Sequence, residues 1–165
     1  MSFRILINGD FMKQFTLPLD RKRQRPTMFL ERFYNLEAML DTGAVLPVWT
    51  EEEELLKGIG AELLIANQPF GGFGGITIGS LYRMPFFRCG DLVYPNMPII
   101  ASRSNLPCHM ILSATMFNNL IYEVDNCHHM FNVSVPDTES VVRNLRVEDK
   151  EGSLHVLCTG VTCEV

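Results

Sequence analysis

One carboxylate in this sequence stands out because of the residues around it. Asp41 follows the apolar pair Met-Leu at positions 39–40. Thr42 and Gly43 come directly after it. An ionised side chain in an apolar run is costly unless it is hydrogen-bonded or paired. The pattern therefore indicates either a turn at the end of a strand or an acid placed there for proton transfer.

Two further segments downstream have features that suit a binding site. Residues 70–76 contain four glycines around Phe73, between two apolar runs. Glycine adopts positive φ easily and leaves the backbone N–H groups open to a ligand, so this stretch predicts a mobile hairpin tip. Residues 109–117 (HMILSATMF) place an apolar pair before Ser113, and a short helix is expected to follow.

In this order the three segments resemble the retropepsin-like aspartic proteases, the single-domain retroviral and cellular relatives of pepsin. That family carries two apolar residues, Asp-Thr/Ser-Gly and Ala, then a glycine-rich flap, then Ile/Leu-Leu-Gly before a short helix. Residues 39–44 (MLDTGA) match the first signature, and residues 71–75 resemble the flap. Residues 111–113 (ILS) resemble the third signature. The resemblance spans about residues 36–120.

The resemblance implies a role for each site residue. Asp41 would be the catalytic acid and base, and Thr42 would brace the site by hydrogen-bonding across the aspartate pair. Gly43 would let the backbone turn and bring its N–H to the carboxylate. Ala44 would line the substrate groove. The flap residues that would contact the substrate are Gly71, Gly72, Phe73, Gly74 and Gly75.

The number of aspartates sets the expected assembly. In this family, water is activated between two carboxylates that share one proton, because two like charges so close cannot both ionise. The chain has one Asp-Thr-Gly, and residues 136–140 (PDTES) lack both the glycine and the apolar frame. A protease would therefore be a homodimer with one Asp41 from each chain at the two-fold axis. Its flaps would close over an extended peptide or protein substrate.

Two departures from the family pattern keep a second interpretation open. Ser113 stands where the family has Gly, and residues 124–165 have no family counterpart. This C-terminal extension could extend a dimer sheet, cover the groove or inhibit the enzyme. Both departures favour a non-catalytic peptide- or partner-binding module, whereas the intact Asp-Thr-Gly-Ala favours the endopeptidase more. A β-rich structural protein with a chance Asp-Thr-Gly is the third alternative.

The remaining pattern predicts an all-β domain with one or two short helices, either a small barrel or a sandwich. The resemblance implies the small closed barrel of the retropepsin-like acid proteases. Residues 3–7 and 11–19 are expected to form a hairpin, as is the segment 141–161. A capping box at Thr50 and Glu53 predicts a helix that ends at Gly58 or Gly60. A second short helix is expected from residue 114.

Length and composition narrow the class of protein. The 165 residues suggest one domain, 1–165, and 47% hydrophobic with 20% charged residues is typical of a globular protein. The net charge of −5 argues against a nucleic-acid partner, and the basic stretch 20–26 is expected to be a solvated loop tip. There is no apolar run of membrane-spanning length, so no membrane association is expected. Five cysteines without a CxxC pair, and a poor secretory signal, favour the cytoplasm.

No cofactor or metal is expected. Cys127-His128-His129 and Cys108-His109 lack the paired spacing of zinc ligands. No cysteine lies in a nucleophile motif, and the glycine-rich stretch lacks the lysine and the helix of a phosphate-binding loop.

Overall fold

The computed structural model describes residues 3–7, 10–23, 25–72, 75–151 and 153–160, and most of these residues lie in strands. The expected all-β class is confirmed, since one α-helix and one 3-10 helix are the helical elements of the described chain. A four-stranded sheet has the order β1 (Phe3–Ile7), β2 (Asp10–Pro18), β11 (Met130–Pro136), β10 (Ile121–Asp125). A separate hairpin pairs β12 (Arg143–Lys150) with β13 (Ser153–Gly160).

The third sheet has seven strands and contains the three segments singled out in the sequence. Its order is β3 (Thr27–Leu30), β4 (Leu36–Asp41), β9 (Met110–Ser113), β5 (Val48–Trp49), β8 (Leu92–Ala101), β7 (Gly75–Cys89), β6 (Glu62–Gly72). The predicted closed barrel is wrong for the described residues. β3 and β6 remain as two edges of the sheet, and no strand pairing joins them.

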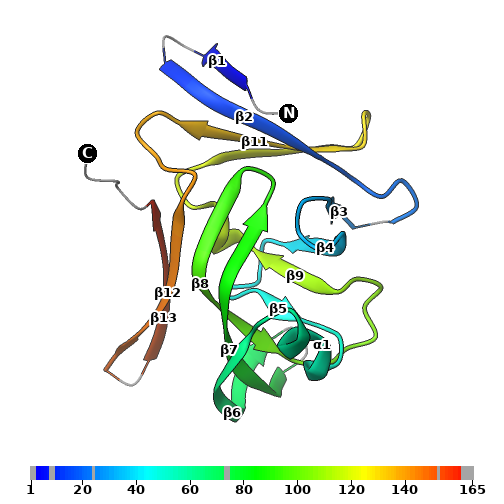
Figure 1. Cartoon of the computed structure of the whole chain (residues 1–165), viewed down its shortest axis with the longest axis vertical. Helices are drawn as coiled ribbons and strands as arrows, with labels where there is room; N and C mark the ends of the chain where they lie inside the picture. The colour runs from blue at the N-terminus through cyan, green and yellow to red at the C-terminus, as the bar shows by residue number, and fades with distance from the viewer. Residues whose placement is uncertain (1–2, 8–9, 24, 73–74, 152, 161–165) are drawn as a thin grey trace.

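The C-terminal part of the chain completes the fold on two sides. β11 pairs antiparallel with β2, so residues 130–136 belong to the four-stranded sheet. Figure 1 shows the β12–β13 hairpin standing beside β8. The Val93 N–H donates to the Val141 carbonyl at 2.9 Å at this junction. Leu145 and Cys158 of the hairpin are buried in the same hydrophobic core as the seven-stranded sheet.

The two helices are where the sequence placed them, but one cap differs. α1 (Glu53–Gly58) follows Glu52, whose side chain makes no capping bond. The predicted capping box at Thr50 is wrong, because the Thr50 hydroxyl donates to the Cys108 carbonyl at 2.6 Å instead. The predicted end at Gly58 or Gly60 is confirmed: α1 ends at Gly58, and Gly60 follows the C-cap Ile59 with a φ of +102°, a conformation that suits glycine. η1 (Ala114–Phe117) is the short helix expected after Ser113.

Neither helix in the described ranges has the length that crossing a membrane would need.

Gly90 fixes the tight turn between β7 and β8, and we expect its substitution to be costly. Its φ is +59°, and an added Cβ would lie 2.2 Å from the Phe15 ring of β2. Gly90→Ala should lower the free energy of unfolding by about 2 to 4 kcal/mol, through backbone strain and overpacking. Urea denaturation measures this.

Gly58→Ala is the matched control, because nothing lies within 4 Å of its added Cβ and its φ is ordinary. We expect it to be neutral or stabilising by up to about 1 kcal/mol. Equal losses in the two variants would contradict the role given to the Gly90 turn.

Candidate functional site

The Asp41 carboxylate is held by the turn that follows it. β4 ends at Asp41, and the Ala44 N–H donates to the Asp41 carbonyl at 3.1 Å. The Gly43 N–H donates to Asp41 Oδ1 at 2.9 Å. A Cβ at position 43 would lie 3.3 Å from that oxygen, so the close approach suits glycine. The backbone thus compensates part of the cost of placing a charge at the end of a buried strand.

The tip of this turn faces outward. Asp41 is half-buried, whereas Thr42 and Gly43 are exposed, and Ala44 is half-buried. Within the described residues the Thr42 hydroxyl has no hydrogen-bond partner. A carboxylate with one backbone donor, beside an exposed hydroxyl, can accept a proton from a bound water or meet a second group from outside.

β9 supports the turn from the other side. β4 and β9 run parallel, with Asp41 opposite Ser113. Ser113 is fully buried, and its hydroxyl lies 2.8 Å from the Thr115 hydroxyl. Thr115 in turn donates to the Val45 carbonyl at 2.5 Å. The buried Ser113 hydroxyl is therefore accommodated by hydrogen bonding, and the chain of hydroxyls ties residue 45 to η1.

The predicted glycine-rich hairpin is present as β6 and β7. Gly72 pairs with Gly75, Gly71 pairs with Ile76, and Phe73 and Gly74 lie outside the described residues. No hydrogen bond or ion pair of the described chain joins this hairpin to residues 41–44. Its surface is unusually apolar, and it carries the exposed side chains of Leu63, Leu64, Ile65, Ile76 and Ile78.

A basic loop lies beside the Asp41 strand, and sequence reasoning did not connect the two. The loop comprises residues 20–26, of which 24 is outside the described chain. β3 and β4 pair antiparallel with Thr27 opposite Met39, and the Leu40 N–H donates to the Pro26 carbonyl at 3.0 Å. The sequence does contain a signal for this proximity. Strand-like runs on both sides of residues 32–35 indicate a hairpin, and such a hairpin places residue 26 beside residue 40.

The described cysteines and histidines do not form an alternative centre. Burial raises the pKa of the Cys89 thiol to about 12, and burial also raises the pKa of Cys108 and Cys158. Such thiols are poor nucleophiles near neutral pH. His109 Nδ1 accepts the Glu37 N–H at 2.9 Å. Among the residues with a described position, no three metal-ligating side chains gather.

Comparisons with known proteins are sparse. No protein-family model matches the chain, and no curated protein matches it. Among solved structures, the chain is similar to a retropepsin-like aspartic protease from Rickettsia conorii at 10% identity, over 82% of this chain and 96% of that one, with a TM-score of 0.49.

The hydroxyl link between η1 and the Asp41 turn can be tested with Thr115→Val. The variant leaves the buried Ser113 hydroxyl without its partner and frees the Val45 carbonyl. We expect a loss of about 1 to 2 kcal/mol in the free energy of unfolding. Amide hydrogen exchange at Ala44 should become faster, because its N–H lies in the loosened turn.

Thr16→Val is the matched control, because that exposed hydroxyl donates to Asn132 far from the site. Its effect should stay within about 0.5 kcal/mol, with unchanged exchange at Ala44. Unchanged exchange in both variants would show that the hydroxyl link does not hold the turn.

Proposed function

We propose that the chain is one protomer of a homodimeric aspartic endopeptidase. The observation that carries the proposal is the Asp41 carboxylate itself, fixed by the Gly43 N–H at 2.9 Å on a turn whose tip is exposed. Its partner in the reaction would be the Asp41 of a second protomer. Thr42, which is exposed at the same tip, is suited to hydrogen-bonding across such a pair.

The reaction follows from two carboxylates that share one proton. The ionised carboxylate takes a proton from the bound water while the oxygen attacks the peptide carbonyl. The protonated carboxylate gives its proton to the carbonyl oxygen. The tetrahedral diol then collapses: the amide nitrogen takes a proton from the first carboxylate, one diol hydroxyl returns its proton to the second carboxylate, and the C–N bond breaks. The atoms balance as one water added across one peptide bond.

The other predicted residues serve binding in this proposal. Ala44 would form the groove wall beside the dyad. Residues 71–75, the glycine-rich stretch that includes Phe73, would close over the peptide and exclude water from it.

A non-catalytic peptide-binding module is the second candidate. The observation that favours it is the free edge of β6, which is exposed from residue 62 to 69 and carries large apolar side chains. A peptide could add there as a further strand without any chemistry at Asp41.

The two candidates differ in what Asp41→Asn does to peptide cleavage. We expect the wild type to cut a diverse peptide mixture in acid, with activity falling as the pH rises and both carboxylates ionise. Asp41→Asn should lower the rate at least about a thousandfold. Mass spectrometry of the products measures both.

Asp91→Asn is the matched control, because that aspartate pairs with Arg32 at 3.4 Å in another turn. It should retain the wild-type rate. No cutting by a folded wild-type dimer would favour the binding module, and equal cutting by wild type and Asp41→Asn would remove Asp41 from the chemistry.

Mixing the two proteins tests whether the site is shared between chains. If each site needs two intact Asp41 residues, an equal mixture with exchanging subunits should retain about a quarter of the wild-type activity. A site complete within one chain would leave about half. Measuring the rate against the mixing ratio separates these results, and a linear dependence would contradict the shared dyad.

A further inference from the structure

We propose that the basic loop is a second binding surface, one that holds acidic side chains of a peptide next to the Asp41 turn. The binding residues are Arg21, Lys22 and Arg25. If the chain is the proposed endopeptidase, the acidic peptide would be its substrate. That part of the inference rests on the proposed function.

The basic loop contains cationic side chains that form no ion pair with a carboxylate of the described residues. Eight described lysine and arginine side chains, one in the loop and seven elsewhere, lie within ion-pair distance of a carboxylate. They are Arg23 in the loop and Arg32, Lys57, Arg83, Arg103, Arg143, Arg146 and Lys150 elsewhere. Arg21, Lys22 and Arg25 have no such partner among the described residues, and all three are exposed. Lys13 and Arg88 are the only other unpaired cations whose side chains are described, and neither lies in the loop.

Two of the three acids that flank the loop, Asp20 and Glu37, already have partners. Asp20 Oδ1 accepts the Lys22 backbone N–H at 2.8 Å, and Asp20 Oδ2 lies 3.6 Å from Arg23. Arg23 also lies 3.7 Å from Glu37. Arg23 therefore lies within ion-pair distance of both carboxylates, whereas no carboxylate of the described residues lies within that distance of Arg21, Lys22 or Arg25.

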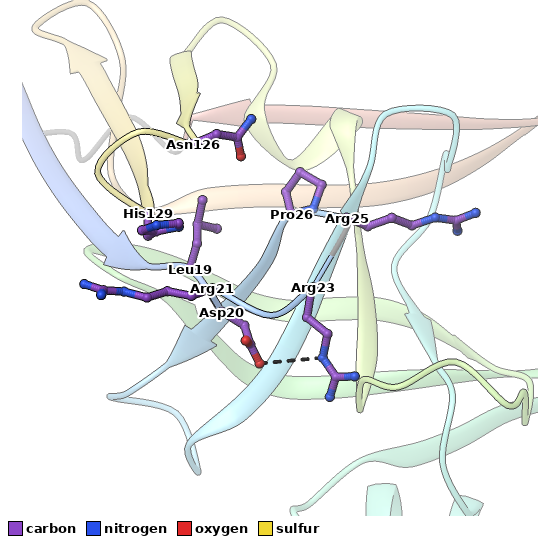
Figure 2. Close-up of a pocket in the computed structure, with 8 residues that line it drawn as sticks. All are labelled: Leu19, Asp20, Arg21, Arg23, Arg25, Pro26, Asn126 and His129. Atoms are coloured by element: carbon purple, nitrogen blue, oxygen red, sulfur yellow. Dashed lines mark ion pairs between the residues drawn. The ribbon is translucent and has the colours of Figure 1, made fainter.

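The loop borders a small hollow. Its volume is about 100 Å³, and Leu19, Pro26, Asn126 and His129 line it together with loop residues. Figure 2 shows Arg21 and Arg25 projecting from opposite sides of the loop, with Arg23 turned toward Asp20. The hollow has room for one or two carboxylate groups, and the flanking guanidinium groups offer the paired donors that carboxylates prefer.

The register places this surface next to the candidate site. Pro26 hydrogen-bonds to Leu40, the residue before Asp41, and Arg25 precedes Pro26. An extended peptide advances about 3.3 Å per residue. A peptide lying across the Asp41 turn can therefore reach the loop with residues only a few positions from the scissile bond.

A peptide fits this surface better than a nucleic acid does. The whole chain carries a net charge of −5. The loop has three unpaired cations, and Asp20, Glu31 and Glu37 flank them. A nucleic-acid site instead presents a long stripe of basic side chains along many phosphates. A short peptide segment with a few carboxylates matches the three loop cations in number and in the distance over which they are spaced.

The binding test uses the Asp41→Asn variant of the whole 165-residue chain, so that cleavage proposed at Asp41 does not consume the probe. The probe is a fluorescent dodecapeptide with four glutamates followed by an apolar half, and its matched probe carries glutamines instead. Fluorescence anisotropy at low salt should show about tenfold tighter binding of the glutamate probe. Physiological salt should reduce the difference.

Two triple variants locate the effect. Replacing Arg21, Lys22 and Arg25 by glutamine should remove the preference for glutamate. Replacing Lys57, Arg103 and Arg146 by glutamine changes the net charge equally at ion-paired positions and should leave the preference intact. Equal binding of both probes, or an equal loss of preference in both triple variants, would overturn the proposal. Tighter binding of a single-stranded oligouridine than of the glutamate probe would replace it with nucleic-acid recognition.

The same probes keep this inference separate from the proposed function. If the wild type cuts no peptide but the glutamate preference depends on the loop, the acidic-peptide surface stands and the protease is refuted. If the wild type cuts the glutamate and glutamine probes at equal rates and binds them equally, the protease stands and the surface is refuted.

Discussion

The parallel pairing of β4 with β9 is the constraint on which the candidate site depends. It joins segments about seventy residues apart in the chain and sets Asp41 opposite Ser113. Parallel neighbours require a long crossover, and here the crossover contains α1 and the strands β5 to β8. The carboxyl ends of both strands then lie at one edge of the sheet, so the turn after β4 and the helix after β9 meet there. There the Ser113 hydroxyl hydrogen-bonds to the Thr115 hydroxyl, which donates to the Val45 carbonyl.

The C-terminal hairpin supports the same region from behind. The Arg143 guanidinium is fully buried, donates to the Asn118 carbonyl after η1, and pairs with Glu139 at 3.2 Å. The Tyr94 hydroxyl donates to the Met116 carbonyl at 2.7 Å, which satisfies another acceptor of the short helix. A buried arginine is costly unless its donors find acceptors, and the two Nη atoms find them here while Nε has none among the described residues. The two Nη contacts tie the start of the hairpin to the end of η1. The extension that looked like an addition in the sequence is thus packed against the helix that carries Thr115.

Local pattern predicted much of this chain, and long-range pairing accounts for what it missed. The strand runs, the glycine-rich hairpin and the short helix after Ser113 follow from residue alternation and turn chemistry. The closed barrel failed because closure depends on which strands become edges, and nothing in the runs of β3 or β6 specifies that. The capping box failed because the Thr50 hydroxyl found a carbonyl 58 residues away. Composition placed the basic loop in solvent correctly but could not show that Pro26 lies against Leu40.

The cations near the Asp41 turn would act more strongly on a bound ligand than on the Asp41 carboxylate. Arg21, Lys22 and Arg25 are exposed, so solvent and salt weaken their field on a carboxylate that they do not touch. A ligand carboxylate in direct contact with them would lose part of its own hydration and would experience a much stronger attraction. The loop can therefore select an acidic ligand without neutralising the Asp41 carboxylate, whose nearest donor remains the Gly43 N–H. If both proposals hold, ligand selection by the loop before β3 and proton transfer at the end of β4 would involve different residues, so that either could change without disturbing the other.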